Sequence, residues 1–230
     1  HALLVYALFG LLSAMLLWKM PNHRLPSPKR IMQRQRLSPR DKRPALLYAS
    51  LIALVTFVSN GTSTHLPEYI ASVGLSVAVG MLWGIGQTGA RFLEVASGSV
   101  LTPLRLTILT TLLMPLCFAL GLSGPYLSWA AGGFVLGYGA INGLTTVFKA
   151  TPPLQLFAAE DYARRTGILL IPAQLLAAAS PFAYAWLNDH LGIRGSLAVS
   201  AALALVVAAL AMAIAWCQRE NTPAAIEERG

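Results

Sequence analysis

Long apolar runs separated by short charged or turn-forming segments dominate the chain. Uncharged runs cover 2–18, 45–64, 69–90, 106–148, 166–188 and 195–218. Five of them have about 17 to 24 residues, which is the length of a transmembrane helix. The remaining run, 106–148, is long enough for two crossings, and Ser-Gly-Pro-Tyr at 123–126 predicts the turn between them. The pattern therefore predicts seven transmembrane helices.

Composition agrees with an all-α integral membrane fold. The chain is 56% hydrophobic and 11% charged, whereas soluble proteins average roughly 25% charged residues. Between positions 45 and 218 there are only 11 charged residues, in short clusters. No soluble core explains seven successive runs of this length, because helices that pack around a soluble core carry a polar stripe at a period of 3.6 residues. A soluble fold is therefore excluded.

The basic residues predict an orientation. The formal net charge is +8, and when successive segments are assigned to alternate sides, one side receives 16 of the 17 Lys and Arg residues. Arg194 is the exception. Because positive residues are retained in the cytoplasm, we expect the sequence to begin outside and end inside. The turns near 65–75, 123–126 and 188–195 would then be external.

Four segments follow from this topology. Residues 1–20 form a first transmembrane helix, 21–44 a basic cytoplasmic linker, 45–218 a six-helix bundle, and 219–230 a cytoplasmic tail. The linker holds five prolines and eight basic residues against one acid, Asp41, a composition that does not fold alone. Because the sequence enters an apolar run directly after His1, we expect it to be the later part of a longer protein.

Several function classes are excluded by what the sequence lacks. The basic residues lie at membrane borders rather than over a polar surface, so no nucleic-acid partner is expected. The cysteines, Cys117 and Cys217, lie in apolar runs and have no metal-ligand spacing. No cluster of catalytic side chains lies within the runs. We expect no enzyme activity, cofactor or metal.

Polar residues inside the runs are the candidates for function, because polar groups in lipid usually face the protein interior. Amide, hydroxyl and guanidinium groups recur at helical spacing on four runs. The candidate substrate-binding residues are Asn60, Gln87, Arg91, Tyr138, Asn142 and Gln174. The alternative is that these groups only form hydrogen bonds between helices. Glycine pairs at four-residue spacing, Gly80/Gly84 and Gly139/Gly143, favour close helix packing.

Three charged residues are candidates for gating or coupling: Glu68, Arg91 and Glu94. Arg91 and Glu94 are three residues apart, a spacing that permits an ion pair within one helix. Arg91 could equally extend to the lipid headgroups or contact an anionic substrate. Glu68 lies at the outer end of its run, where a desolvated carboxyl group can carry a proton, although solvation in a loop is the simpler interpretation.

Specific motifs resemble the second half of a major facilitator superfamily transporter over essentially the whole chain. Residues 84–91, Gly-Ile-Gly-Gln-Thr-Gly-Ala-Arg, are similar to the glycine-rich eighth span of that family, with Gln87 where the monocarboxylate branch often has aspartate. The stretches 142–144 and 153–157, followed by Tyr162 and Gly167, are similar to the region linking spans ten and eleven. Residues 2–18 would then be span six, followed by the central loop and spans seven to twelve.

The resemblance implies a secondary transporter that moves a small solute by alternating access. It suggests that transport is coupled to protons and that the substrates are organic anions or drugs. The implied partners are a small-molecule substrate, the lipid bilayer and a missing N-terminal six-helix half, and the implied location is a bacterial inner membrane. The alternatives are a seven-helix receptor or another non-transporting membrane protein. Against a retinal-binding receptor, residues 195–218 contain no lysine that could bind retinal.

Overall fold

The described part of the protein is helical. The computed structural model describes Met15 and residues 39–97, 102–156 and 162–227. Its elements are α2 (Pro39–Ser72), the 3₁₀ helix η1 (Val77–Gly80), α3 (Met81–Ser97), α4 (Pro103–Ser123), α5 (Ser128–Leu156) and α6 (Tyr162–Glu227), with no strand among these residues. They belong to one compact unit, Leu37–Gly230. Apart from Met15, the predicted span at 2–18 lies outside the described residues, and so does most of the linker at 21–44.

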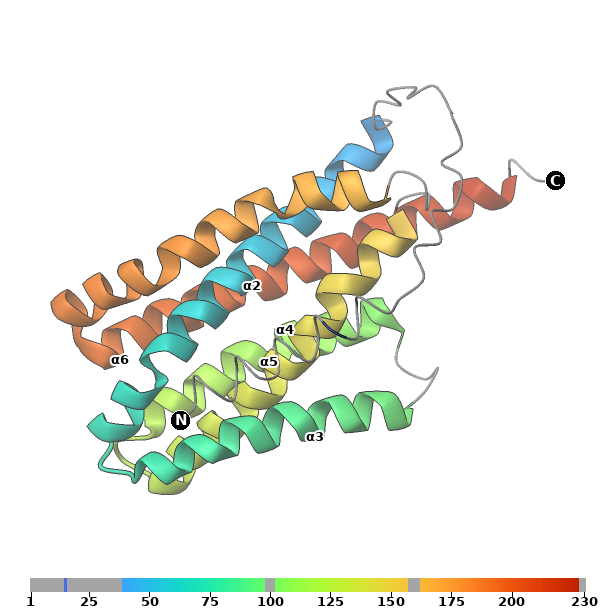
Figure 1. Ribbon diagram of the computed structural model, residues 1–230. Coiled ribbons are helices and arrows are strands. Elements are labelled where there is room, and N and C mark those ends of the chain that lie inside the picture. Colours follow the sequence, from blue (N-terminus) through green and yellow to red (C-terminus); the bar gives the residue numbers. More distant parts are fainter. Residues whose placement is uncertain (1–14, 16–38, 98–101, 157–161, 228–230) are drawn as a thin grey trace. The chain divides into compact units, whose positions relative to one another are not determined.

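Three of these helices are long and apolar enough to cross a membrane: Ala45–Ser72, Leu104–Ser123 and Leu170–Cys217. The third is 48 residues long and changes direction at Gly192, whose φ of 69° and ψ of 171° are not helical. Its two arms run back along each other (Figure 1), and Tyr184 on the first arm bonds Ser200 on the second. The helices indicate a membrane protein, and the seven predicted spans stay a prediction.

The boundary between α2 and α3 corrects the sequence analysis. Helix α2 continues through the predicted turn to Ser72, and α3 begins only at Met81, so a span at 69–90 is wrong. Helix α2 ends in a Schellman motif: Gly74 has a φ of 72°, its N–H bonds the Ala71 carbonyl, and the Leu75 N–H bonds the Ile70 carbonyl. Because the turn residues around Gly74 are themselves apolar, hydropathy did not reveal the break.

The other two predicted turns agree with the structure. Helix α4 ends at Ser123 and α5 begins at Ser128, and the long α6 helix breaks at Gly192. All three connections lie at the same end of the bundle (Figure 1), here called the turn end. Among the described Lys and Arg residues, Arg194 alone lies at the turn end. The helices thus carry the charge asymmetry that the sequence predicts.

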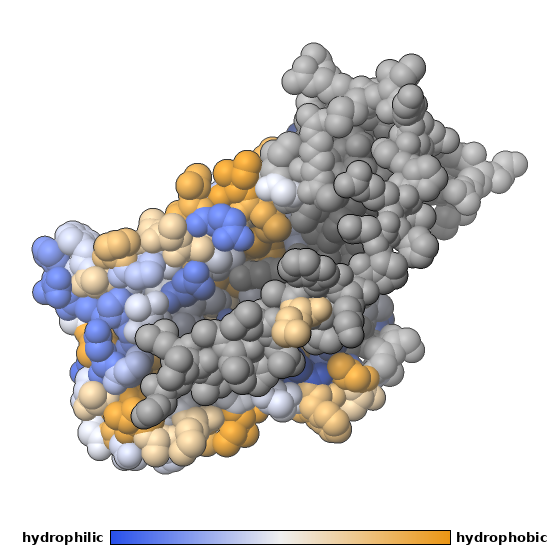
Figure 2. Space-filling model, in the orientation of Figure 1, coloured by the Kyte–Doolittle hydropathy of each residue, from blue (hydrophilic) through white to orange (hydrophobic). Residues whose placement is uncertain are grey.

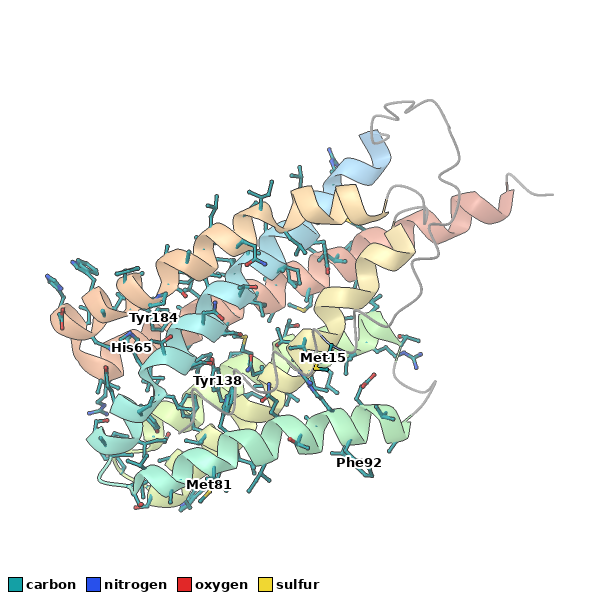
Figure 3. The ribbon with its side chains drawn as sticks, viewed as in Figure 1. Met15, His65, Met81, Phe92, Tyr138 and Tyr184 are labelled. Atoms are coloured by element: carbon teal, nitrogen blue, oxygen red, sulfur yellow. The ribbon has the colours of Figure 1, made fainter. Side chains whose placement is uncertain are left out.

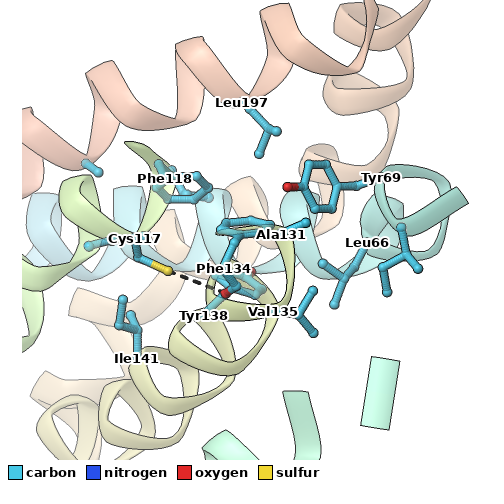
Figure 4. Packing of buried hydrophobic residues seen from close by; sticks show 14 residues of the cluster. Leu66, Tyr69, Cys117, Phe118, Ala131, Phe134, Val135, Tyr138, Ile141 and Leu197 are labelled. Atoms are coloured by element: carbon cyan, nitrogen blue, oxygen red, sulfur yellow. Dashed lines mark hydrogen bonds between the residues drawn. The ribbon is translucent and has the colours of Figure 1, made fainter. Parts of the chain in front are cut away.

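Two hydrophobic clusters hold the helices together. Helix α2 packs on α6, α3 packs on α5, and α4 contacts both α5 and α6. One cluster centres on stacked and tilted aromatic rings of Tyr69, Phe118, Phe134 and Tyr138 (Figure 4). The second joins the half of α2 that lies away from the turn end to α6, through residues that include Leu51, Ile52 and Val207.

The surface of the bundle is unusually apolar, while several hydroxyl residues are buried among the hydrophobic ones. Of the described residues, ten that are buried are Ser or Thr, among them Thr110, Ser180 and Ser200. Large apolar side chains, in contrast, are exposed along α3, α4 and α6, including Phe92, Leu116 and Phe182. In Figure 2 hydrophobic patches lie among paler and hydrophilic residues, and many of the hydrophilic ones lie toward the turn end. The many large apolar side chains exposed on the described helices fit a lipid-facing surface.

Candidate functional site

Glycines bring the backbones of α3 and α5 into direct contact. A Cβ atom added to Gly139 would lie 2.1 Å from the Trp83 carbonyl oxygen, and one added to Gly86 would lie 2.1 Å from the Leu136 oxygen. One turn further along α5, Gly143 faces the Gln87 backbone in the same way, at 2.6 Å. The predicted packing role is therefore confirmed for Gly139 and Gly143.

The other predicted glycine pair makes no close backbone contact with another helix among the described residues. Nothing there lies within 4 Å of a Cβ atom added to Gly84, and Gly80 belongs to η1, where the nearest atom, Ile70 Cδ1 of α2, is an ordinary 3.7 Å away. Within this part of the chain, Gly80 and Gly84 do not bring two helix backbones together as the spacing predicts. The glycine of α3 that contacts α5 is Gly86, which belongs to neither of the glycine pairs selected by four-residue spacing.

Tyr138 lies in the core of the bundle rather than on its surface. Its side chain is fully buried, and its hydroxyl group donates to the Ser59 carbonyl oxygen at 2.6 Å. Because that hydrogen is committed, Ser63 Oγ, 3.1 Å away, donates to the Tyr138 oxygen. Tyr138 thus joins α5 to α2 in this conformation, and its predicted contact with substrate stays a prediction.

Arg91 joins α3 to α5 through Thr146. The guanidinium Nη2 donates to Thr146 Oγ1 at 2.8 Å, and both side chains are exposed. No ion pair joins Arg91 to Glu94 in the described part of the chain, so the pair that the spacing permits is absent in this conformation. Arg91 keeps most of its donors free, because a guanidinium group has five N–H bonds.

The four predicted amide residues differ in exposure, but all four lack a side-chain hydrogen bond to the described helices. Asn60 and Gln174 are exposed, whereas Gln87 and Asn142 are partly buried beside the contact of α3 with α5. Within residues 39–97, 102–156 and 162–227, none of these four side-chain amides makes a hydrogen bond. Bonds between the described helices therefore do not account for them, and their donors and acceptors stay available to water, a ligand or another protein segment.

A polar cluster at the turn end joins α2 to the first arm of α6. His65 Nδ1 lies 2.9 Å from Glu68 Oε2, and His65 Nε2 lies 3.3 Å from the Pro181 carbonyl oxygen. Asn188 Nδ2 donates to the same Glu68 oxygen at 3.3 Å. The Tyr184 ring is nearly parallel to the imidazole, with the ring centroids 6.4 Å apart, and Figure 3 labels the two residues near each other. Glu68, predicted for coupling, is thus a helix residue with two polar partners and an exposed side chain, and is not in a loop.

A small cavity adjoins this cluster. Its volume is about 20 Å³, enough for about one water molecule. Two of its lining residues hold buried oxygens without a hydrogen bond among the described residues, Thr62 Oγ1 and Asn188 Oδ1. Thr62 Oγ1 lies close to the Tyr138 and Tyr184 hydroxyl groups but does not meet the geometry of a hydrogen bond to either. An ordered water is the usual partner of such groups.

Sequence reasoning missed Asn188, Tyr184 and Thr62. Tyr184 and Asn188 are four residues apart on a predicted span, and Thr62, His65 and Tyr69 have the same kind of spacing on α2. These two stripes were available as a signal, because residues at such spacing share one helix face. Their pairing was not, since Glu68 and Asn188 are 120 residues apart in the sequence.

No group of three or more His, Cys, Asp or Glu side chains that could hold a metal ion occurs among the described residues. Comparison of the chain with protein-family models, with curated proteins and with solved structures gives no match.

Proposed function

We propose that this chain is half of a secondary transporter, which moves a small solute across a membrane by alternating access. The observation that carries the proposal is the set of uncommitted side-chain amides at Asn60, Gln87, Asn142 and Gln174. Placing an amide in hydrocarbon without a partner is costly. The four residues therefore favour a water-filled cavity, completed by the six-helix half that the family resemblance implies.

The charge distribution supports a membrane orientation for this half. Basic residues cluster at the end opposite the turns, which is the cytoplasmic end by the positive-inside rule. In this topology α2, α3, α4, α5 and the two arms of α6 are six spans of a bacterial inner-membrane protein. The turn end, with His65 and Glu68, then faces the outside.

The contact between α3 and α5 supports a bundle in which these two helices move together as one rigid unit. Backbone packing through Gly86, Gly139 and Gly143 fixes these two helices to each other. Arg91 and Thr146 lie on the same pair of helices, next to the amides of Gln87 and Asn142. One guanidinium group among amide donors favours an organic anion, with amphiphilic drugs as the other substrate class to be tested.

Cysteine accessibility tests the cavity. In a background with Cys117→Ala and Cys217→Ala, single cysteines replace Asn60, Gln87, Asn142 or Gln174, and membranes containing the complete protein are treated with a hydrophilic maleimide. We expect labelling at all four positions, because maleimide reacts with a thiolate in water. Leu116→Cys and Leu205→Cys are the matched controls, since both side chains are exposed on apolar helix faces. Equal resistance of amide and leucine positions would contradict a water-filled cavity.

A further inference from the structure

A pocket lies between the end of α2, the 3₁₀ helix η1 and the first turn of α3. Its volume is about 190 Å³, and an engineered cavity of about 150 Å³ in another protein binds benzene. Ser63, Pro67 and Ile70 line the pocket from α2, Gly80 lines it from η1, and Trp83 lines it from α3. Within the described residues, the backbones of α2 and α3 each approach η1 but not each other. The pocket therefore lies where the two helices diverge from the turn that joins them (Figure 1).

Trp83, which lines the pocket, carries a buried polar group without a partner. Its Nε1 bonds no acceptor in residues 39–97, 102–156 and 162–227, whereas nearly all buried donors in proteins have a partner. The hydroxyl groups of Ser59 and Thr110 also lack one in this part of the chain, but a hydroxyl group can turn to a carbonyl of the preceding helical turn. An indole N–H is only a donor and has no such local acceptor. Its acceptor must come from outside the described helices.

The rest of the lining is uncharged. Leu66, Pro67 and Val77 supply hydrocarbon surface, and no lining residue carries a charge. Ser63 Oγ donates to Tyr138, so its lone pairs remain for a ligand. Because an ion buried without a counter-charge is costly, the pocket favours an apolar group with an uncharged oxygen over a bare carboxylate.

The size of the pocket favours a small solute over a lipid chain or a water molecule. Its lining on α2 covers residues 63–70, which is about 10 Å along the helix axis. A lipid acyl chain extends through one leaflet, about 15 Å, and needs a longer groove. A water molecule would satisfy the indole N–H but would leave most of the pocket volume unfilled.

We propose that this pocket, here called the Trp83 pocket, binds the apolar group of a small solute, and that Trp83 Nε1 donates to an uncharged oxygen on that group. Its role as part of a substrate site rests on the proposed transport function. Asn60 lies one turn before Ser63 on α2, and Gln87 lies one turn after Trp83 on α3. Residues at such spacing share a helix face, so the pocket borders two of the uncommitted amides. The apolar end of an amphiphilic substrate then lies near the turn end.

Fluorine nuclear magnetic resonance of a bound probe tests the pocket in the complete, purified protein. The probe is para-fluoroacetophenone, which has an aromatic ring and a carbonyl oxygen, and para-fluorotoluene is the matched probe without an acceptor. We expect both probes to bind the wild-type protein at a saturable site. The absence of saturable binding for both would overturn the proposal.

Two substitutions that fill the pocket locate the binding. Gly80→Leu adds a side chain from η1, and Val77→Trp enlarges a lining side chain that is 74% exposed and so burdens the fold less. Each should abolish saturable binding in folded protein. Gly84→Leu is the matched control and should bind as the wild-type protein does, because Gly84 is not in the lining and nothing lies within 4 Å of its added Cβ atom among the described residues. Binding that persists in both filled variants would overturn the proposal.

Trp83→Phe tests the hydrogen bond. It removes the N–H and keeps an aromatic ring, so the affinity for para-fluoroacetophenone should fall about two- to tenfold, the effect of one hydrogen bond. The affinity for para-fluorotoluene, which accepts no hydrogen bond, should change much less. Equal falls for the two probes would overturn the assignment of the indole as donor.

Two further measurements separate the alternatives. The titration is repeated in vesicles of phosphatidylethanolamine and phosphatidylglycerol, where loss of probe binding would make a lipid the occupant and overturn the binding of a solute. Flux separates the pocket from transport. Probe binding without flux of any compound removes the transport function and leaves the pocket, whereas flux of amphiphilic drugs that is unchanged in Gly80→Leu overturns the role of the pocket in transport.

Discussion

The backbone contact between α3 and α5 gives the sharpest stability prediction. In Gly139→Ala the new Cβ atom would lie 2.1 Å from the Trp83 carbonyl oxygen, and side-chain carbons essentially never approach within 3.0 Å of another atom. The obstacle is backbone, which cannot rotate away, so α3 and α5 must separate by about 0.9 Å over this contact.

The cost follows from two opposing effects. Overpacking of a well-packed interface costs about 1–3 kcal/mol, and a backbone clash belongs at the upper end of that range. Alanine stabilises a helix by about 1 kcal/mol relative to glycine, so the net loss in free energy of unfolding is about 2 kcal/mol. For a chain of this length that corresponds to a fall in Tm of roughly 4–8 °C.

The assay is thermal unfolding of the purified protein in mild detergent, with Gly84→Ala as the control. Gly84 lies on the facing helix, but nothing lies within 4 Å of its added Cβ atom, so this variant should be as stable as the wild-type protein or slightly more so. Gly86→Ala should match Gly139→Ala, and Gly143→Ala should be intermediate, since its Cβ would meet Gln87 at 2.6 Å. Equal Tm values for Gly139→Ala and Gly84→Ala would refute backbone contact between α3 and α5.

Three further predictions test other contacts. Tyr138→Phe removes the hydrogen bond to Ser59 and should destabilise the protein by about 1 kcal/mol, whereas an unchanged Tm would show that this bond contributes nothing. Gly61→Ala places a Cβ atom 2.2 Å from the Tyr184 ring, so it should lower the Tm of the wild-type protein. The same substitution should lower the Tm of Tyr184→Ala much less, and equal falls in the two backgrounds would show that the two residues are not in contact. Thr146→Val removes the acceptor of Arg91 but keeps the charge, so it should raise the KM for an anionic substrate less than Arg91→Ala does, and the reverse order would move Arg91 to a structural role.

Helices and two of the turns could be predicted from the sequence because their signals are local. Gly124 and Pro125 interrupt an apolar run in a recognisable way, and the last turn contains Gly192 between charged residues. The end of α2 gave no such signal, since the apolar residues Val73 and Leu75 flank Gly74, which adopts a positive φ there. Hydropathy measures composition over a window, whereas the Schellman motif depends on the conformation of a single residue.

The candidate site was predictable as a set of polar residues and not as an arrangement. Helical spacing found Asn142 and Gln87 because it depends only on neighbouring turns. It could not show that Tyr138 is tied to α2, that Arg91 bonds Thr146, or that Asn188 reaches Glu68, because these pairs are distant in sequence. For the same reason the spacing selected Gly84, which faces open space, and overlooked Gly86, which faces the Leu136 backbone.

Solute flux is the most direct test of the transport function. Vesicles containing the complete protein are assayed for uptake and efflux of small carboxylates and amphiphilic drugs, with and without a proton gradient, beside vesicles containing Arg91→Ala or Arg91→Lys. We expect gradient-dependent flux of a carboxylate that is lost in Arg91→Ala and partly retained in Arg91→Lys, which keeps the charge but not the planar donors. Absence of flux for every compound, in protein that is folded and correctly inserted, would contradict it.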